Sequence, residues 1–420
     1  MPTIDDFTRP KELIPPLIDD MGKAIREWVD DRYMPMRRKI DEDWAEHKLV
    51  RPLLKEIMVD FGLNRTLWPV EVGGLDISSL GTTGVGTVRI FEELGRADSG
   101  FAVACGCSLW PVLPITQLPH RNMELCNEFG PRYCGDELYM GCYAMTEPES
   151  GADIENIGRM HGRTIRTTAK RSGEEWVING HKQWPTNSGK VANLFCVLCI
   201  TDEGKDEEGL RLIYVPADTR GVSVGPPYHK AGMAADMNTD IYFDDVHVPL
   251  RYNAQPVEWT VKCFNEIVTI GNLGTAAFSL GVLKNTYEII KKYTSERVVA
   301  GKPLKEHSMN AVILAELAIA IEAASTYSYT VAHMVDAPDV YGPPWSQEIV
   351  AKTRACSMFV SDMAVNHTGR VMELMGSYGY TREGDIEKHW RDSKMLQLWL
   401  GGKQLDLMEV ARYFYECETL

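Results

Sequence analysis

The sequence is short of positive charge and of long uninterrupted apolar runs. Lysine and arginine number 44 against 59 aspartates and glutamates, which gives a net charge of −15. Because nucleic-acid binders concentrate positive charge, we expect no nucleic-acid partner. No apolar run approaches the roughly 20 residues that a membrane span needs, and the acidic start of the chain is unlike a signal or transit peptide. We therefore expect a cytoplasmic protein with no membrane partner.

Disulfide and metal-binding patterns are also missing. The ten cysteines show no disulfide-framework spacing, and a chain of this length buries a core without such cross-links. Cys196 and Cys199 lie in an apolar segment, and no second pair follows at the spacing of zinc ligands, so we expect no metal. No Gly-x-Gly-x-x-Gly motif follows a strand, and strands do not alternate with helices, which argues against a Rossmann fold.

What is present is a helix–strand–helix order. Apolar residues recur at three-to-four spacing up to about residue 129, and short alternating segments follow from about residue 141. After Pro249 the periodicity is helical again, with long segments predicted at about 257–298, 306–335, 346–376 and 393–416. The pattern predicts an α+β protein of three domains, namely an N-terminal α-helical domain at 1–138, a middle antiparallel β domain at 139–252 and a C-terminal α-helical domain at 253–420.

Several short motifs follow one another along the chain. The most informative are Tyr143-Ala-Met-Thr146-Glu-Pro and Trp184-Pro-Thr186-Asn, which lie in the predicted β domain. The others, in chain order, are Glu92-Glu-Leu-Gly-Arg-Ala-Asp98, Lys230-Ala-Gly-Met, Phe243-Asp-Asp-Val-His-Val-Pro249, Ser295-Glu-Arg297, Gly376-Ser-Tyr-Gly379 and Arg391-Asp392. With these motifs, essentially the whole chain resembles the acyl-CoA dehydrogenase family.

The resemblance implies a cofactor, partners and an architecture. It implies FAD as cofactor, an acyl-CoA as substrate and an electron-transfer flavoprotein as electron acceptor. It also implies a four-helix bundle in the C-terminal domain and a homotetramer whose subunits share FAD sites. The positions that match the family's FAD contacts are Met145, Thr146, Ala152, Trp184, Thr186, Arg297, Glu373, Gly376, Gly402 and Gln404.

Some of these positions depart from the family pattern or have another interpretation. Glu373 stands where glutamine is common, and Ala152 stands where a serine usually contacts flavin and substrate. Trp184 is alternatively a buried core aromatic, and Arg297 is alternatively a solvated helix residue. A planar guanidinium nevertheless suits a diphosphate, as the resemblance implies for Arg297.

The carboxylate base of the family is absent from both of its usual positions. Leu400 occupies the common position and Gly271 the less frequent one on the first long C-terminal helix. Glu266, five residues earlier, faces another side of that helix, because five residues turn it by about 140°. Cys105 is a candidate base and alternatively a structural buried thiol. The backbone N–H of Leu400 remains available to polarise a thioester carbonyl.

The glycines near the missing base suggest the shape of the substrate. Gly271 and Gly274 lie inside a predicted helix, where each costs about 1 kcal/mol relative to alanine. With Trp399 and Leu400 they predict a wide apolar pocket, although close helix packing explains the glycines equally well. Ala102 stands where relatives that bind dicarboxyl substrates carry an arginine, so a glutaryl-type substrate is disfavoured.

These features predict an FAD-dependent dehydrogenase that acts on a cyclic or bulky acyl-CoA, for example a cyclohexene-carboxyl-CoA-type substrate. In a ring already unsaturated next to the thioester, acidity is relayed along the double bond, so a 1,4-elimination replaces the usual 1,2-elimination. Two alternatives remain, namely lyase-like non-redox chemistry on an acyl-CoA and a non-catalytic flavin-binding subunit.

Overall fold

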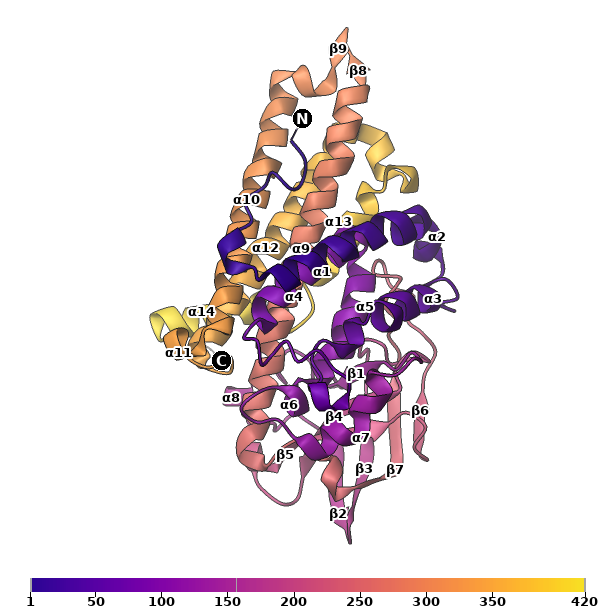
Figure 1. Ribbon diagram of the computed structural model, residues 1–420, viewed down its shortest axis with the longest axis vertical. Helices are drawn as coiled ribbons and strands as arrows, with labels where there is room; N and C mark the ends of the chain where they lie inside the picture. Colours follow the sequence, from indigo (N-terminus) through magenta and orange to yellow (C-terminus); the bar gives the residue numbers. More distant parts are fainter. Residues whose placement is uncertain (1, 156, 419–420) are drawn as a thin grey trace.

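Helices form the N-terminal part of the computed structural model, which describes residues 2–155 and 157–418 (Figure 1). Asp98 separates two of these helices, because its carboxylate caps the second by accepting hydrogen bonds from Gly100 N (2.8 Å) and Phe101 N (3.1 Å). The helices are α1 (Pro16–Trp28), α2 (Arg37–Glu42), α3 (Val50–Lys55), α4 (Thr83–Ala97), α5 (Ser99–Leu109), α6 (Leu113–Thr116) and α7 (Met123–Tyr133).

The middle of the chain forms a seven-stranded sheet in the order β1-β4-β2-β3-β7-β6, with β5 paired to β4. Its elements are β1 (Gly141–Ala144), α8 (Ile157–Met160), β2 (Thr168–Ser172), β3 (Glu175–Lys182), β4 (Leu194–Thr201), β5 (Leu210–Pro216), β6 (Val222–Val224) and β7 (Ile241–Pro249). Most pairs are antiparallel, but β4 runs parallel to β1 and β2, so the sheet is mixed rather than purely antiparallel as predicted. Long connections before β4 permit this parallel pairing, which a hairpin cannot form.

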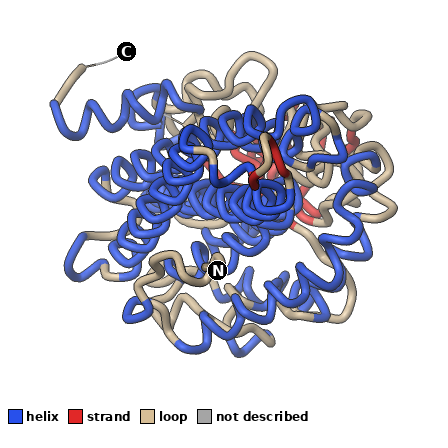
Figure 2. Tube along the Cα trace, turned by 90° about the horizontal axis from the view of Figure 1, so that it is seen from above, coloured by secondary structure: helices blue, strands red, loops and turns tan. Residues whose placement is uncertain are grey.

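Long helices make up the C-terminal part, and Figure 2 shows them side by side in the view from above. The elements are α9 (Val257–Glu296), β8 (Val298–Val299), β9 (Lys302–Pro303), α10 (Ser308–Asp336), α11 (Pro338–Tyr341), α12 (Gln347–Met375), α13 (Ile386–Leu396) and α14 (Gly402–Tyr415). The prediction of a single helix at 393–416 is wrong, because a turn separates α13 from α14. Gly401 and Gly402 adopt φ angles of +85° and +75°, which are incompatible with a continuous right-handed helix.

Three segments are long and apolar enough to cross a membrane by length and composition, so the expectation that no apolar stretch reaches this length is wrong. Ser99–Thr116 contains no charged residue at all, but serine, glycine, cysteine and threonine interrupt its larger apolar side chains, so a search for uninterrupted apolar runs missed it. The apolar windows in Ser99–Thr116 and Val257–Glu296 are completely buried in the protein, whereas that in Ser308–Asp336 is only 28% buried. Much of the apolar surface of α10 therefore faces outward in the single chain.

Helices α4 and α9 cross at close range and join the N-terminal and C-terminal parts. A Cβ atom on Gly95 would lie 2.6 Å from Phe278 Cα, and one on Gly281 would lie 2.3 Å from Glu92 O. Any side chain at either glycine would push the helices apart. The motif that begins at Glu92 therefore serves, at least in part, to join these two helices.

A buried cluster of charges surrounds this crossing. Glu92 contacts Lys284 Nζ at 2.7 Å and Arg9 Nη2 at 2.8 Å, and Glu93 contacts Arg26 Nη2 at 2.6 Å. Burial raises the pKa of Glu92, but the charges of Lys284, Arg9 and its other basic neighbours outweigh this and lower the pKa to about 2. The carboxylate is therefore ionised in the folded protein at neutral pH.

We expect Lys284→Met to lower the free energy of unfolding by about 3–5 kcal/mol, because it leaves a buried carboxylate with less compensation. Urea unfolding followed by tryptophan fluorescence measures this. The matched control is Lys23→Met, which removes an exposed lysine paired with Asp19 and should leave the unfolding midpoint unchanged. Equal midpoints for both variants would show that the crossing does not depend on the buried charge.

Candidate active site

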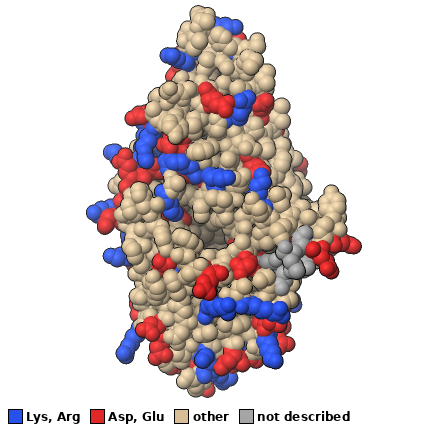
Figure 3. All heavy atoms as spheres, turned by 180° about the vertical axis from the view of Figure 1, so that it is seen from behind, with Lys and Arg blue, Asp and Glu red and all other residues tan. Residues whose placement is uncertain are grey.

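A cavity of about 770 Å³ lies where the three parts of the chain meet, a volume within the usual range for small-molecule sites. Val103 and Cys107 of α5, Tyr143 at β1, Ile267 of α9 and Trp399 after α13 all contribute to its wall. Figure 3 shows one face of the molecule, where acidic and basic side chains are interspersed around a central hollow. The cavity wall itself is mostly apolar and aromatic.

Half of the residues predicted to contact the flavin line this cavity. They come from two loops, one after β1 and one after β3, and a third loop from residue 228 to 238 faces them. The side chain of Trp184 is 49% exposed and lies 4.8 Å from the Tyr228 ring, so the alternative of a buried core aromatic is wrong. The lining residues of the predicted set are Met145, Thr146, Ala152, Trp184 and Thr186.

A buried ion pair holds the first two loops together. Lys182 Nζ donates to Glu147 Oε1 and to Met145 O, both at 2.8 Å. The Glu147 carboxylate also accepts hydrogen bonds from Arg166 N (2.7 Å) and Thr167 N (2.9 Å). Burial raises the pKa of Glu147, but Lys182 and these donors lower it below its usual range. The pair therefore fixes the backbone of Met145 relative to the end of β3.

A second buried ion pair positions the third loop. Lys388 of α13 lies between Asp98 (2.8 Å) and Asp392, and Asp392 Oδ1 accepts a hydrogen bond from Met233 N (2.7 Å). A Cβ atom on Gly232 would lie 2.7 Å from Asp392 Oδ1, so the close approach requires glycine. The cap of α5, helix α13 and the third loop are thus one connected unit.

Three residues other than glycine on the cavity wall have a left-handed backbone. The φ angles are +50° for Trp184, +53° for Met233 and +50° for Leu400. Such residues are uncommon, and strained backbone of this kind tends to gather at functional sites. The strain supports a functional role for this cavity.

The turn between α13 and α14 contributes Trp399 and Leu400. Trp399 Nε1 donates to Thr275 Oγ1 at 3.0 Å, which fixes the turn against α9. Among the described residues, no backbone or side-chain group accepts a hydrogen bond from the Leu400 N–H. This donor therefore remains available for a ligand, as the sequence predicts.

The two glycines of α9 do not open the pocket as predicted. A Cβ atom on Gly271 would lie 3.0 Å from Leu400 Cδ1, and one on Gly274 would lie 2.5 Å from Trp110 Cζ2. Neither glycine lines the cavity. The space that they leave is filled by the Leu400 and Trp110 side chains, which themselves form part of the cavity wall.

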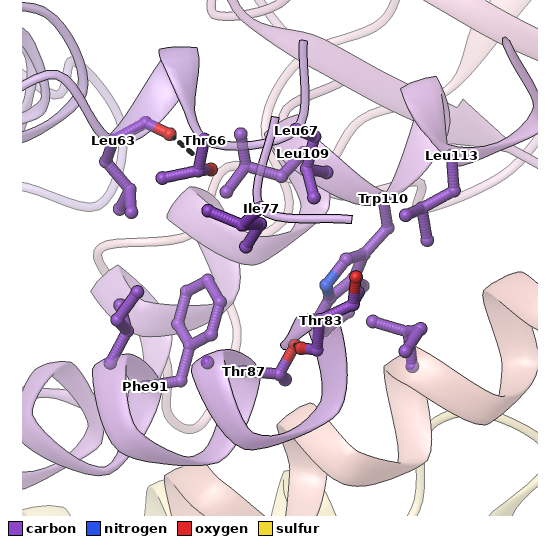
Figure 4. A pocket seen from close by; sticks show the side chains of 13 residues that line it. Leu63, Thr66, Leu67, Ile77, Thr83, Thr87, Phe91, Leu109, Trp110 and Leu113 are labelled. Carbon is purple, nitrogen blue, oxygen red and sulfur yellow. Dashed lines mark hydrogen bonds between the residues drawn. The ribbon is translucent and has the colours of Figure 1, made fainter. Parts of the chain in front are cut away.

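Trp110 also lines a second, much smaller apolar cavity of about 20 Å³ (Figure 4). The figure shows Phe91, Ile77 and Leu109 around it, together with the hydrogen bond from Thr66 to Leu63 O. This space holds about one water molecule, too little for a substrate group. Trp110 lies on the walls of both cavities.

The structure contradicts Cys105 as a catalytic base. The Cys105 thiol is completely buried and does not line the cavity, and burial raises its pKa far above the usual range. Cys107, two residues later, lines the cavity, but burial also raises the pKa of its thiol. As predicted, Glu266 faces away from the cavity, where it pairs with His120 at 3.2 Å.

Two carboxylates on the cavity wall were missed from the sequence. Asp236 contacts Lys230 Nζ at 3.2 Å and Thr186 Oγ1 at 3.4 Å, beside the predicted flavin residues. Glu155 lies near the turn that contains Leu400 and Gly401. The sequence signal was their position close to recognised motifs, because Glu155 follows the first tract by seven residues and Asp236 follows Lys230 by six.

The remaining predicted cofactor residues do not line this cavity in the single chain. Arg297 ends α9 and is exposed, and it lies roughly 45 Å along that helix from Ile267 at 1.5 Å per residue. Glu373 and Gly376 lie near the same end of the bundle, where Glu373 is exposed and pairs with Arg370 at 2.7 Å. Gly402 and Gln404 begin α14 just beyond the cavity.

The sequence and the described fold match those of the acyl-CoA dehydrogenases. Three family models match in the same order, namely the acyl-CoA dehydrogenase N-terminal domain at 18–118, middle domain at 142–246 and C-terminal domain at 262–414. Butyryl-CoA dehydrogenase from Megasphaera elsdenii has the same fold, with a TM-score of 0.82 at 22% identity over 96% of this chain and 99% of that chain. The class is therefore that of flavin-dependent acyl thioester oxidoreductases.

The chain belongs to the acyl-CoA dehydrogenase family, and it is an FAD-dependent oxidoreductase. It is 29% identical to cyclohexane-1-carbonyl-CoA dehydrogenase of Syntrophus aciditrophicus over 93% of this chain and 94% of that protein. It is 28% identical to cyclohex-1-ene-1-carbonyl-CoA dehydrogenase of Geobacter metallireducens over 92% of this chain and 95% of that protein. A glutaryl-CoA dehydrogenase solved with FADH2 shares the fold at a TM-score of 0.82.

The cavity of this chain fits FAD and an acyl thioester. Buried polar atoms without a hydrogen-bond partner lie on its lining residues, namely Tyr143 Oη, Asp236 Oδ1 and Glu155 Oε2. Buried polar groups normally find partners, so these atoms indicate space for a ligand that supplies them. Bound FAD supplies the acceptor for the hydride that an acyl thioester loses during dehydrogenation.

We expect Lys182→Met to lower the FAD content of the purified protein and its Tm, because it frees Glu147 and the Met145 carbonyl. The ratio of absorbance at 450 and 280 nm and a thermal scan measure the two effects. Lys170→Met, on the exposed side of β2, is the matched control and should change neither. Normal FAD content in the Lys182 variant would show that the ion pair does not position the flavin loop.

Proposed function

We propose that this acyl-CoA dehydrogenase acts on the CoA thioester of a cyclic or bulky carboxylic acid. The observation that carries the proposal is the broad aromatic end of the cavity. Trp110 and Trp399 lie with ring centroids 6.0 Å apart, and Leu400 packs beside them against Gly271. Such a blunt apolar wall suits a ring or branch better than a straight chain. The relatives named for cyclohexane and cyclohexene substrates support the same choice.

The reaction removes two hydrogens from the substrate. The substrate would lose a proton to a base and a hydride, for which bound FAD would supply the acceptor, and one new C=C bond would form. In a ring already unsaturated next to the thioester, the proton leaves from a remote ring carbon, so the elimination is of the 1,4 type. The free Leu400 N–H polarises the thioester carbonyl, a role that depends on the backbone rather than the side chain.

The cofactor contacts form two groups in this proposal. The first group lines the cavity and holds the isoalloxazine ring, and it comprises Met145, Thr146, Ala152, Trp184 and Thr186. The second group binds the FAD of a neighbouring subunit, and it comprises Arg297, Glu373, Gly376, Gly402 and Gln404. The separation along α9 supports this division, because Arg297 cannot reach the cavity of its own chain.

Shared sites require an oligomer, and we propose a homotetramer located in the cytoplasm. The surface of α10 supports assembly, since Met309, Val312 and Ile319 are 80%, 58% and 69% exposed in the single chain. An electron-transfer flavoprotein is the proposed acceptor of the electrons that the substrate leaves on the cofactor.

The substrate proposal predicts which thioesters bleach the flavin. Under anaerobic conditions, cyclohexene- or cyclohexane-carboxyl-CoA should reduce the absorbance near 450 nm, whereas butyryl-CoA and octanoyl-CoA should not. Leu400→Glu should raise reduction by straight saturated thioesters about 100-fold, because it restores a carboxylate beside the α-carbon. Leu400→Gln has the same size without the charge and should give no gain. Bound FAD that no thioester reduces would instead favour the non-redox or non-catalytic alternative.

We expect Arg297→Ala to weaken FAD retention although Arg297 lies far from the cavity of its own chain. Dialysis followed by flavin fluorescence of the filtrate measures the loss. Arg171→Ala, an exposed arginine of β2, is the control and should retain FAD. If the Arg297→Ala variant is a monomer by light scattering and still retains FAD, the proposal of an FAD site shared between subunits is wrong.

A further inference from the structure

Glu155 places a carboxylate on the wall of the active-site cavity. Its side chain is only 4% exposed, and Oε2 has no hydrogen-bond partner among the described residues. A buried carboxylate oxygen without a donor is costly, so its presence on a ligand-binding wall needs a functional reason. Asp236, the other carboxylate there, is already paired with Lys230 and contacts Thr186.

The Glu155 carboxylate lies beside the turn where the family's base is missing. A Cβ atom on Gly401 would lie 3.2 Å from Glu155 Oε2, and Gly401 directly follows Leu400. The left-handed backbone of Gly401 and its missing side chain leave room for the carboxylate. Glu155 of the middle domain thus supplies a carboxylate next to the C-terminal turn, whose own residue nearest this point, Leu400, has no acidic group.

Charged neighbours behind the cavity control the ionisation of Glu155. Arg354 of α12 has Nη2 4.0 Å from Glu155 Oε2, but Arg354 also forms a buried ion pair with Asp406 of α14. Burial raises the pKa of Glu155 to about 8, with Asp406 adding to the rise and Arg354 opposing it. The other charged or titratable residues on the cavity wall are Cys107, Tyr143, Tyr228, His229, Lys230, Asp236, Arg391 and Lys394.

We propose that Glu155 is the catalytic base that removes the proton from the substrate. The inference rests on the proposed function. The C–H bond of the substrate breaks, its proton forms an O–H bond with the Glu155 carboxylate, and the released electron pair forms the new C=C bond as a hydride leaves another carbon for bound FAD. A buried carboxyl that ionises near neutral pH suits this task. Cys105 and Cys107 do not, because burial keeps both thiols protonated.

The first test compares Glu155→Gln with Glu266→Gln, a buried glutamate outside the cavity. With the thioester that reduces the wild-type holoenzyme, Glu155→Gln should slow anaerobic flavin reduction by about 100-fold or more. Its FAD content and its Kd for the thioester should stay normal, and Glu266→Gln should keep the wild-type rate. A Glu155→Gln rate within threefold of wild type, or a loss of FAD and thioester binding in parallel with the rate, overturns the assignment.

The second test uses pH. Because the base must be ionised, the wild-type reduction rate should rise with pH through a midpoint near 8. Asp406→Asn removes a charge that raises the Glu155 pKa, so the midpoint should move to lower pH. A wild-type rate that does not change between pH 6 and pH 9 contradicts the proposal even if the Asp406 variant fails to fold.

A stability measurement tests the same group without catalysis. The folded protein keeps a proton on Glu155 that the unfolded chain releases above about pH 4.5, so this group makes the wild type less stable as pH rises from there through about 8. The Tm of Glu155→Gln minus the Tm of the wild type should therefore increase between pH 5 and pH 9. A difference in Tm that stays the same over this range contradicts an unpaired Glu155 carboxyl.

The two proposals fail in different ways. If no thioester reduces the FAD of the wild type, the proposed function is contradicted. If Glu155→Gln still reduces its FAD, only the base assignment is contradicted.

Discussion

The contact between Glu92 and Lys284, buried where α4 crosses α9, is the interaction on which the site depends. It compensates two charges that neither helix could bury alone, and Gly95 and Gly281 allow the helices to approach closely enough for it to form. Helix α5 follows α4 after Asp98, and α9 carries one wall of the cavity. The crossing therefore determines how the N-terminal and C-terminal walls of the cavity face each other.

The loops that line the cavity are held in place by ion pairs buried outside its wall. Buried ion pairs, Glu147 with Lys182 and Lys388 with Asp98 and Asp392, fix the loops that line it. The residues that line the cavity differ from these paired groups. Trp184 and Leu400 have strained backbone, and several polar atoms of the lining have no hydrogen-bond partner. Loops fixed by buried ion pairs, together with lining polar atoms that have no partner, are the arrangement expected of a preorganised ligand site.

The sequence motifs predicted the order of the three parts, the FAD cofactor and the family, and for some of these motifs the structure shows a local geometric reason. Gly232 and Gly95 of the Glu92 tract are examples, since a side chain at either glycine would clash with a neighbouring segment. The wrong predictions on Gly271, Gly274 and Cys105 depended on packing between distant segments. Helical periodicity does not say that Trp110 fills the space over Gly274, nor that Cys105 faces away from the cavity. Glu155 was missed because its neighbour Gly401 comes from the opposite end of the chain.

Trp110 forms part of the wall of both the large cavity and the small apolar one next to it. Its indole packs over Gly274 of α9. A single codon thus determines the side chain shared by the two walls, and a smaller residue there would join the two cavities into one larger space.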